Sequence, residues 1–259
     1  MKALRVFKRF AVLALAVLAT YLTYRFLIGR ITSPGLYTPW ILLLWLFTAY
    51  IVLPRIHRKL VKVYLPDYFI GRTRTGDGLL GDPVNLAIIG SRRQLVRAMK
   101  QAGWHEADEL NAASSWKMTI STVLKRSYPT APVSSLYLFG EQQALAFQQE
   151  VDGNTHQRHH VRFWPTPKDW WLPGGYRADW LGAATYDRSV GFSAFTLQFT
   201  HKIEEDIDIE RDYVISTLHE AKTTTKVETV EHYASGFRSR NGGGDHIRTD
   251  GNLPFIHLS

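Results

Sequence analysis

The sequence predicts an α+β fold: two N-terminal transmembrane helices followed by one mixed α/β soluble domain with a largely antiparallel sheet. Three observations predict it. Two long apolar stretches open the chain, at 10–28 and 36–53. Beyond residue 82, helical spacing of apolar residues gives way to a period of two. The roughly 160 residues before a Gly-rich C-terminal segment suit one domain with a single core, and are too few for two.

The two apolar stretches satisfy the length test for a membrane span, which needs about 20 mostly apolar residues. The stretch 36–53 carries no charge, has Pro39 in its first turn and is followed by Pro54, which we expect to close it. In 10–28 the single charge, Arg25, lies near the far end, where its side chain can reach the interface. Residues 1–65 are therefore predicted to form a transmembrane hairpin.

The charge distribution sets the expected orientation. Ten Lys and Arg residues precede Asp67 and no acidic residue does, which leaves 21 of the chain's 31 basic residues to balance 23 acidic ones. The basic excess thus belongs to the lipid anchor, and we expect no nucleic-acid partner. Arg30 alone occupies the short connection, so both termini should be cytoplasmic. A signal peptide cleaved near Ala19 is the alternative, and it leaves the domain on the same side.

The remaining segments divide into a linker, a domain and a tail. Residues 66–81 have several glycines and no apolar period, so they are predicted to be a juxtamembrane linker. The soluble domain is expected over 82–234, and the Gly-rich, charged segment 235–259 is expected to be mobile, with Leu253–Ile256 as the part that could dock back. Cysteine is absent, which excludes disulfides, thiolate nucleophiles and zinc–thiolate sites.

The domain elements follow from local signals. An apolar strand at 84–89 precedes a helix capped by Ser91 and ended by Gly103. A second helix is expected at 115–125. Alternating segments then predict strands, and acidic residues open a helix at 206–220 whose inward side chains would be Ile209, Tyr213 and Val214. The predicted strands lie at 135–139, 144–151, 159–164, 180–186, 189–200 and 223–233.

One candidate site lies on the predicted strand 159–164. In extended geometry His160, Arg162 and Trp164 share one face, while His159 and Val161 face the other. An Arg and a His beside an aromatic wall can hold a phosphate or carboxylate, with the His as acid or base. The alternative, weighed equally, is an exposed turn leading into an edge strand.

A second group is acidic. His201 precedes a run of carboxylates that includes Asp208 and Glu210, next to Arg211, and such a run could hold a hard cation. The spacing matches no metal motif, so helix capping by Asp206 or Asp208 and an Arg211 ion pair are favoured. Asp187 ends an apolar strand; if buried, it needs a partner such as Arg162, Arg211 or a His, and otherwise it is a turn residue.

The segment 164–176 is rich in both proline and aromatic residues, which is unusual for a solvated loop. It could form a lip for a sugar or lipid headgroup, or pack on its own core, and we favour packing. The turn Gly90-Ser91 could bind phosphate at a helix N-terminus. It lacks the glycine-rich fingerprints, so a plain strand-to-helix turn is favoured.

Four segments in order, DPVNLAIIGS, HHVRFW, WLGAATYDRSVGF and HKIEEDIDIERDYV, give the soluble part a resemblance to the LssY C-terminal domain family, over about 82–218. The resemblance implies a bacterial envelope setting, without a settled reaction. It marks seven residues inside these motifs to be tested together: His160, Arg162, Asp187, His201, Asp208, Glu210 and Arg211.

These observations lead to two functional hypotheses. The first is an inner-membrane protein whose cytoplasmic domain binds an anionic envelope- or lipid-derived ligand through Arg162, Arg211 and His160, with Trp164, Asp208 and Glu210 as further ligand-binding candidates. If it is a phosphoester hydrolase, His160, Asp187 and His201 are the catalytic candidates. The second is a non-catalytic module that docks a partner membrane protein. The sequence identifies no cofactor and no metal.

Overall fold

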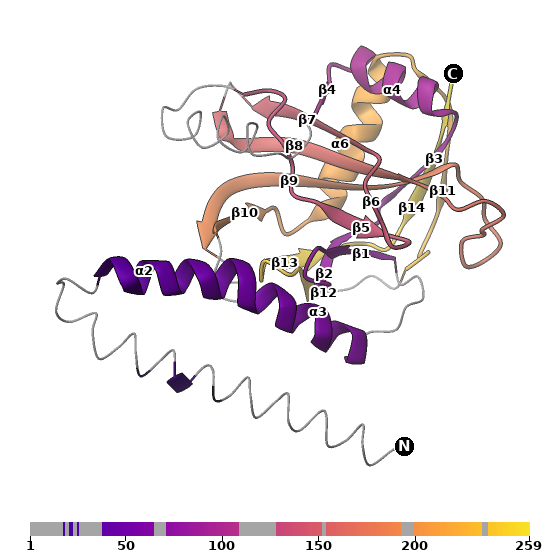
Figure 1. Ribbon diagram of the computed structural model, residues 1–259. Coiled ribbons are helices and arrows are strands. Elements are labelled where there is room, and N and C mark those ends of the chain that lie inside the picture. The colour runs from indigo at the N-terminus through magenta and orange to yellow at the C-terminus, as the bar shows by residue number, and fades with distance from the viewer. Residues whose placement is uncertain are drawn as a thin grey trace, which may run out of the picture. The chain divides into compact units, whose positions relative to one another are not determined.

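The computed structural model describes residues 38–64, 71–108, 128–151, 154–192, 199–234 and 238–259, together with 18, 21, 22 and 25 (Figure 1). The chain divides into two compact units, Met1–Val52 and Leu53–Ser259. The second unit holds all the strands among the described residues and the helices α4 and α6, and it contains the candidate sites.

One helical run, Pro39–His57, is long and apolar enough to cross a membrane, which supports membrane association. It is built from α2 (Thr38–Phe47), a π-helical turn (Thr48–Val52) and the start of α3 (Leu53–Tyr64). Pro54 was expected to close this helix, but the helix continues to Tyr64. The wider turn immediately before Pro54 accommodates the missing N–H and the bulk of the ring. The other predicted span, 10–28, falls almost wholly outside the described residues.

The main sheet has eight strands, and its pairing confirms a mixed α+β domain with largely antiparallel sheets. Strand β14 pairs parallel to β3, while the other pairs of this sheet are antiparallel. In spatial order the strands are β11 (Thr224–Val230), β14 (Leu253–Leu258), β3 (Leu86–Ile89), β9 (Trp180–Phe192), β8 (Asn154–Pro165), β7 (Leu145–Val151) and β4 (His105–Glu106), and β10 (Phe199–Ile203) pairs with β9.

Two helices cover one face of this sheet, α4 (Arg92–Gln101) and α6 (Ile207–Glu220). Ser91 caps α4 through a reciprocal pair of hydrogen bonds with Gln94, as the sequence predicts. Asp206 caps α6, also as predicted. The apolar core between helices and sheet includes Leu86, Leu95, Phe147, Phe163, Val214 and Leu218.

The inward face of α6 differs from the prediction at one position. Ile209 is 63% exposed, whereas Ile207, Glu210, Val214 and Leu218 are buried. The inward stripe therefore follows the spacing 207, 210, 214 and 218, which places a carboxylate rather than Ile209 toward the sheet.

The opposite face of the sheet carries a second core and a smaller sheet. The four strands of the smaller sheet, in the order β2-β1-β5-β6, are β2 (Leu80–Pro83), β1 (Arg72–Thr75), β5 (Leu136–Leu138) and β6 (Glu141–Gln142). Leu136 and Leu138 of β5 join a cluster with Trp164, Leu181 and Phe255 of the main sheet. Polar residues fill the rest of this face and form the first candidate site.

Two segments expected to be irregular are part of the fold. Within the predicted linker 66–81, residues 72–75 form β1, where Arg72 donates two hydrogen bonds to the Gly81 carbonyl. Within the predicted tail 235–259, residues 253–258 form β14, whose partner β3 is distant in sequence. The strands β12 (Arg238–Arg240) and β13 (His246–Arg248) also pair there. The predicted helix 115–125 lies outside the described residues.

Candidate functional site

Four buried polar residues, Asp82, Arg162, His160 and Asp187, form a continuous chain on the sheet face opposite the helices, and the last three of them were predicted site residues. Arg162 of β8 donates to the Asp82 carboxylate at 3.2 Å and to His160 Nδ1 at 3.1 Å. His160 Nε2 lies 2.8 Å from Asp187 Oδ1 and 3.3 Å from the Thr185 hydroxyl. Of the two alternatives for Asp187, a turn residue or a buried carboxylate with a partner, the structure has the second, with His160 as the partner.

The hydrogen bonds define the protonation state of His160. A guanidinium can only donate, so Nδ1 accepts from Arg162 and Nε2 carries the proton that is donated to Asp187. Burial lowers the pKa of His160, and the Arg162 charge lowers it further against the opposing effect of Asp187. His160 is therefore a neutral ring with both nitrogens occupied, and it offers no nitrogen to a substrate.

The surroundings of this chain are closed, and most of their polar groups are paired, although Arg158 Nε has no partner among the described residues. Arg162 is 4% exposed and His160 is 5% exposed. The neighbouring Arg158 donates to Gln148 at 3.2 Å, and burial lowers its pKa against the opposing effect of Asp187. An anion entering here would have to displace existing carboxylates, so the arrangement stabilises the packing of β2 against β8 and β9.

Trp164 lies on the same face as His160 and Arg162, as predicted from the strand alternation. Its ring is completely buried in the apolar cluster with Leu181 and Phe255. Its indole N–H has no hydrogen-bond partner among the described residues. It therefore serves as core and does not form the wall of an open site.

Arg211 belongs to a different cluster. Its guanidinium contacts Asp208 at 3.1 Å, Asp212 at 2.8 Å and Asp250 at 2.8 Å. Asp208 also accepts hydrogen bonds from the Thr249 hydroxyl and the Asp250 N–H, which ties the start of α6 to the segment before β14. The favoured interpretation of an Arg211 ion pair is confirmed, and Arg211 does not share a site with Arg162.

Glu210 faces the sheet beneath α6 and pairs with His159. His159 Nδ1 lies 2.6 Å from Glu210 Oε2, and its ring stacks on Tyr213 with centroids 3.9 Å apart. The other carboxylate oxygen is buried without a partner among the described residues. Burial raises the pKa of Glu210 to about 7, against the opposing effect of His159. This pair lies on the helix face of the sheet, opposite His160.

His201 is in β10, opposite Val190 of β9 in the antiparallel register. The placement of its side chain is outside what the structure describes, so its predicted catalytic role stays a prediction. The group of residues marked by the sequence thus divides into three: the Arg162 chain, the Arg211 cluster and the Glu210–His159 pair.

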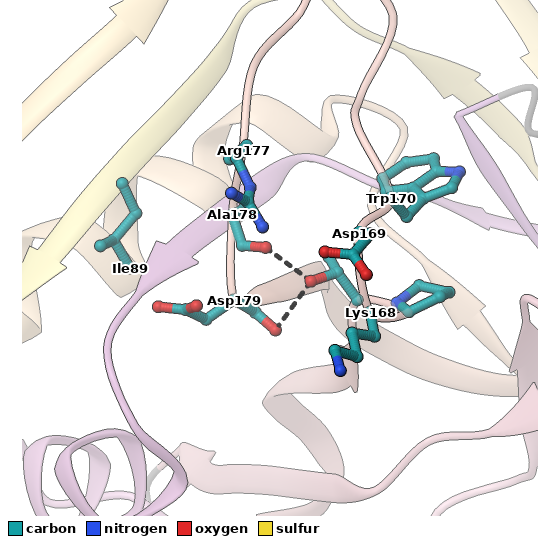
Figure 2. Close-up of a pocket in the computed structure, with 9 residues that line it drawn as sticks. Ile89, Lys168, Asp169, Trp170, Arg177, Ala178 and Asp179 are labelled. Atoms are coloured by element: carbon teal, nitrogen blue, oxygen red, sulfur yellow. Dashed lines mark hydrogen bonds between the residues drawn. The ribbon is translucent and has the colours of Figure 1, made fainter.

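A cleft of about 330 Å³ lies elsewhere, between the loop that follows β8 and the segment that leads into β9. Figure 2 shows Lys168, Asp169 and Trp170 on the loop side, across from Arg177 and Asp179. The Thr166 hydroxyl joins the two sides by donating to the Ala178 carbonyl at 2.6 Å. The remaining lining residues are Ile89, Pro167 and Ala178.

The walls of the cleft are held by packing and by hydrogen bonds. Trp170 packs edge-on against Phe139, with ring centroids 4.7 Å apart. Asp179 accepts from the Gly90 N–H at 2.7 Å, which fixes the end of β3 to this wall. Asp169 adopts a left-handed backbone with φ of 60°, which turns the loop back toward the cleft. These contacts make the cleft a pre-formed feature of the fold.

The charges of the cleft differ from those of the buried chain. Within the described part of the protein, neither Lys168 nor Arg177 forms an ion pair, although Asp169 and Asp179 line the same hollow. The Arg177 guanidinium lies 4.8 Å from the ring centroid of Trp171, a residue that is 53% exposed. Together, two cations, two carboxylates and an indole can recognise a phosphate ester whose alcohol part carries an amine or hydroxyls.

The individual cleft residues were not among the predicted site residues. The signal that could have identified them was the aromatic segment 164–176, for which a headgroup lip was the alternative interpretation. Packing, the favoured interpretation, is confirmed for Leu172, which is buried, and for Tyr176, which packs on Phe255. The segment therefore packs on the core at some positions and lines a cleft at others.

Comparison with known proteins identifies the family of the chain. No curated protein and no solved structure matches the chain. The family model described as LssY C-terminus matches residues 62–253, which extends beyond the resemblance seen at 82–218 and includes β1 as well as the first residue of β14. Because this match covers most of the sequence, the chain belongs to the LssY C-terminus family.

Proposed function

We propose that this protein is a bacterial inner-membrane protein whose domain binds a phosphate-bearing, envelope- or lipid-derived ligand in the cleft of Lys168, Trp170 and Arg177. The observation that carries the proposal is a pre-formed hollow of about 330 Å³ whose two cations have no ion-pair partner among the described residues. Its volume is at the lower end of the range for small-molecule sites, about 300–1,000 Å³.

The proposal moves ligand recognition away from Arg162, Arg211 and His160. Those three side chains already have carboxylate partners, and both nitrogens of His160 are engaged. In the cleft, Lys168 and Arg177 would contact the phosphate, while Asp169 and Asp179 would accept from an amine or from hydroxyls. Trp170 would cover an apolar part of the ligand.

Ligand binding can be tested with the full-length protein in detergent micelles. Glycerol 3-phosphate and phosphoethanolamine are the probes, inorganic phosphate tests the anion alone, and glycerol is the neutral control. A ligand at ten times its Kd stabilises the folded state by about 1.4 kcal/mol, and the melting temperature rises accordingly. We expect a phosphate ester to give this rise.

Variants make the test specific to the cleft. Lys168→Gln and Arg177→Gln should abolish the ligand-dependent rise without changing the ligand-free melting temperature. Arg97→Gln is the matched control, because Arg97 is exposed on α4 and does not line the cleft. Equal shifts in all four proteins, or no shift of the native protein with any probe, would contradict the proposal.

The proposed topology is a two-span anchor with the domain in the cytoplasm. It is supported by the nine basic residues that flank the apolar stretches and by the one helix suited to a membrane among the described residues. Because the chain has no cysteine, Ile209→Cys creates a single exposed thiol on α6. A membrane-impermeant maleimide should label it in permeabilised cells and leave it unlabelled in intact spheroplasts. Labelling in intact spheroplasts would place the domain outside.

A further inference from the structure

The outer edge of the main sheet is formed by an exposed strand, β11. Its central residues, 225–229, are all exposed, and its sequence TTKVETV is rich in β-branched residues that favour strands. Within the described part of the chain β11 pairs with β14 on one side, and no strand pairs with its other edge. An edge of this kind presents unpaired backbone N–H and C=O groups that can accept another strand.

The charges of this strand are arranged symmetrically about Val227. Lys226 and Glu228 flank it, and Thr225 and Thr229 lie one position further out. Lys226 and Glu228 also contact each other within the strand, so both lie on the same face. Protective edge strands usually carry charges that repel a second copy. Here a Lys and a Glu are two residues apart. In one register each charge of one copy therefore faces the opposite charge of the other copy, and the two strands do not repel each other.

We propose that β11 is a self-association edge that pairs antiparallel with β11 of a second copy of this chain, with Val227 opposite Val227. In that register Lys226 of each copy lies opposite Glu228 of the other, and Thr225 lies opposite Thr229. Opposite charges and Thr–Thr pairs in directly facing positions stabilise antiparallel strands. The charge complementarity therefore selects both the partner and the register.

The symmetry of this contact joins each face of the sheet to the same face of the second copy. A two-fold axis perpendicular to the sheet, at Val227, relates the copies and keeps each face continuous across the junction. The face that carries Lys226 and Glu228 in one copy meets the same face of the other. The contact uses none of the cleft residues, so it does not depend on the proposed ligand.

Cysteine cross-linking of the full-length protein tests the register. In a chain without cysteine, Val227→Cys places one thiol at the symmetry axis, where facing Cβ atoms are about 5 Å apart, within reach of a disulfide after a small shift. Oxidation with copper phenanthroline in micelles should therefore cross-link most of the chain. The Ile209→Cys variant, whose position is more accessible than Val227, should stay monomeric.

Two further variants fix the register without relying on Val227. Thr225→Cys alone should not cross-link, since its two copies would be about 13 Å apart along the strands. A mixture of Thr225→Cys and Thr229→Cys chains should cross-link to each other. Val227→Cys cross-linking no faster than Ile209→Cys, or cross-linking of Thr225→Cys to itself, would overturn the proposal.

Charge variants separate contacts between copies from the contact within one strand. Lys226→Glu makes the strand acidic at both positions, and Glu228→Lys makes it basic at both. In the Val227→Cys background each chain alone should lose at least ten-fold in cross-linking rate. The two chains mixed should recover it or exceed the parent, although neither has the internal ion pair. Failure of the mixture to recover would refute pairing between copies in this register. Circular dichroism of each variant confirms that the fold is retained.

Discussion

The buried chain around Arg162 and the cleft around Arg177 both place arginine near carboxylates, yet they can do different things. In the buried chain, Arg162 is 4% exposed and contacts Asp82 directly, and His160 connects it to Asp187. In the cleft, Arg177 and Lys168 have no ion-pair partner among the described residues. A cation can recognise a ligand only where the fold has not already neutralised its charge.

The largest expected effect is the loss of Arg162. Arg162→Ala leaves the Asp82 carboxylate and His160 Nδ1 buried without their donor, and breaking a buried pair costs about 3–5 kcal/mol. Chemical denaturation followed by tryptophan fluorescence should show this fall in the free energy of unfolding. Asp82→Asn added to Arg162→Ala should recover part of it. A loss below about 1 kcal/mol would show that the buried chain is not structural.

Next in size is a pH effect at Glu210. Its pKa is raised by burial to about 7, above its unfolded value, so the folded state binds the proton more tightly. The stabilisation is present below about pH 4.5 and is lost as pH rises toward 7, with an upper bound of about 3 kcal/mol.

The measurement compares Glu210→Gln with the native protein between pH 5 and pH 8. The variant lacks the titrating group, so its melting temperature should fall less over this range. Parallel pH curves would show that Glu210 does not titrate there. A fall that is steeper in the variant would reverse the assigned sign.

A smaller effect is expected at the cleft wall. Asp179→Ala removes the acceptor for the Gly90 N–H, a hydrogen bond of 2.7 Å at a solvent-accessible position. The cost should be about 1 kcal/mol in the free energy of unfolding. Asp179→Asn keeps an acceptor and should recover most of it. Equal destabilisation by Ala and Asn would indicate that the carboxylate charge, rather than the hydrogen bond, is required.

The smallest effect on stability is expected at Arg177, in contrast to Arg162. Arg177→Ala should change the free energy of unfolding by no more than about 0.5 kcal/mol, because removing this side chain leaves no buried polar group without a partner. The same denaturation experiment as for Arg162→Ala provides the measurement. A loss of 2 kcal/mol or more would show that Arg177 is a structural residue, and would weaken the proposed ligand site.

Local sequence signals predicted much of the fold. The capping residues Ser91 and Asp206, and the alternation that places His160 and Arg162 on one face, agree with the structure because each depends on near neighbours in the chain. Long-range pairing was not predictable in the same way. The apolar residues at Leu253–Ile256 indicate that this segment could dock back, but not that it forms a strand parallel to β3, since that pairing depends on residues about 170 positions away.

The candidate site was predicted less well than the fold, for a physical reason. Residue type indicates what a side chain can bind, whereas tertiary structure decides whether that capacity is already used. Arg162 and Arg211 have their carboxylates within the fold, and Arg177 does not. The position of Ile209 shows the same limit, because the core beneath α6 accepts Glu210 beside His159 in its place.

The position of β14 between β3 and β11 constrains how the sheet can be assembled during synthesis. When translation has reached Val230, β11 exists but its only sheet neighbour in the described fold has not been made. One edge of the apolar strand β3 stays uncovered for the same interval. A nascent chain stalled before Leu253 should therefore be sensitive to proteases and bound by chaperones, and protection should begin once residues 253–258 have left the ribosome.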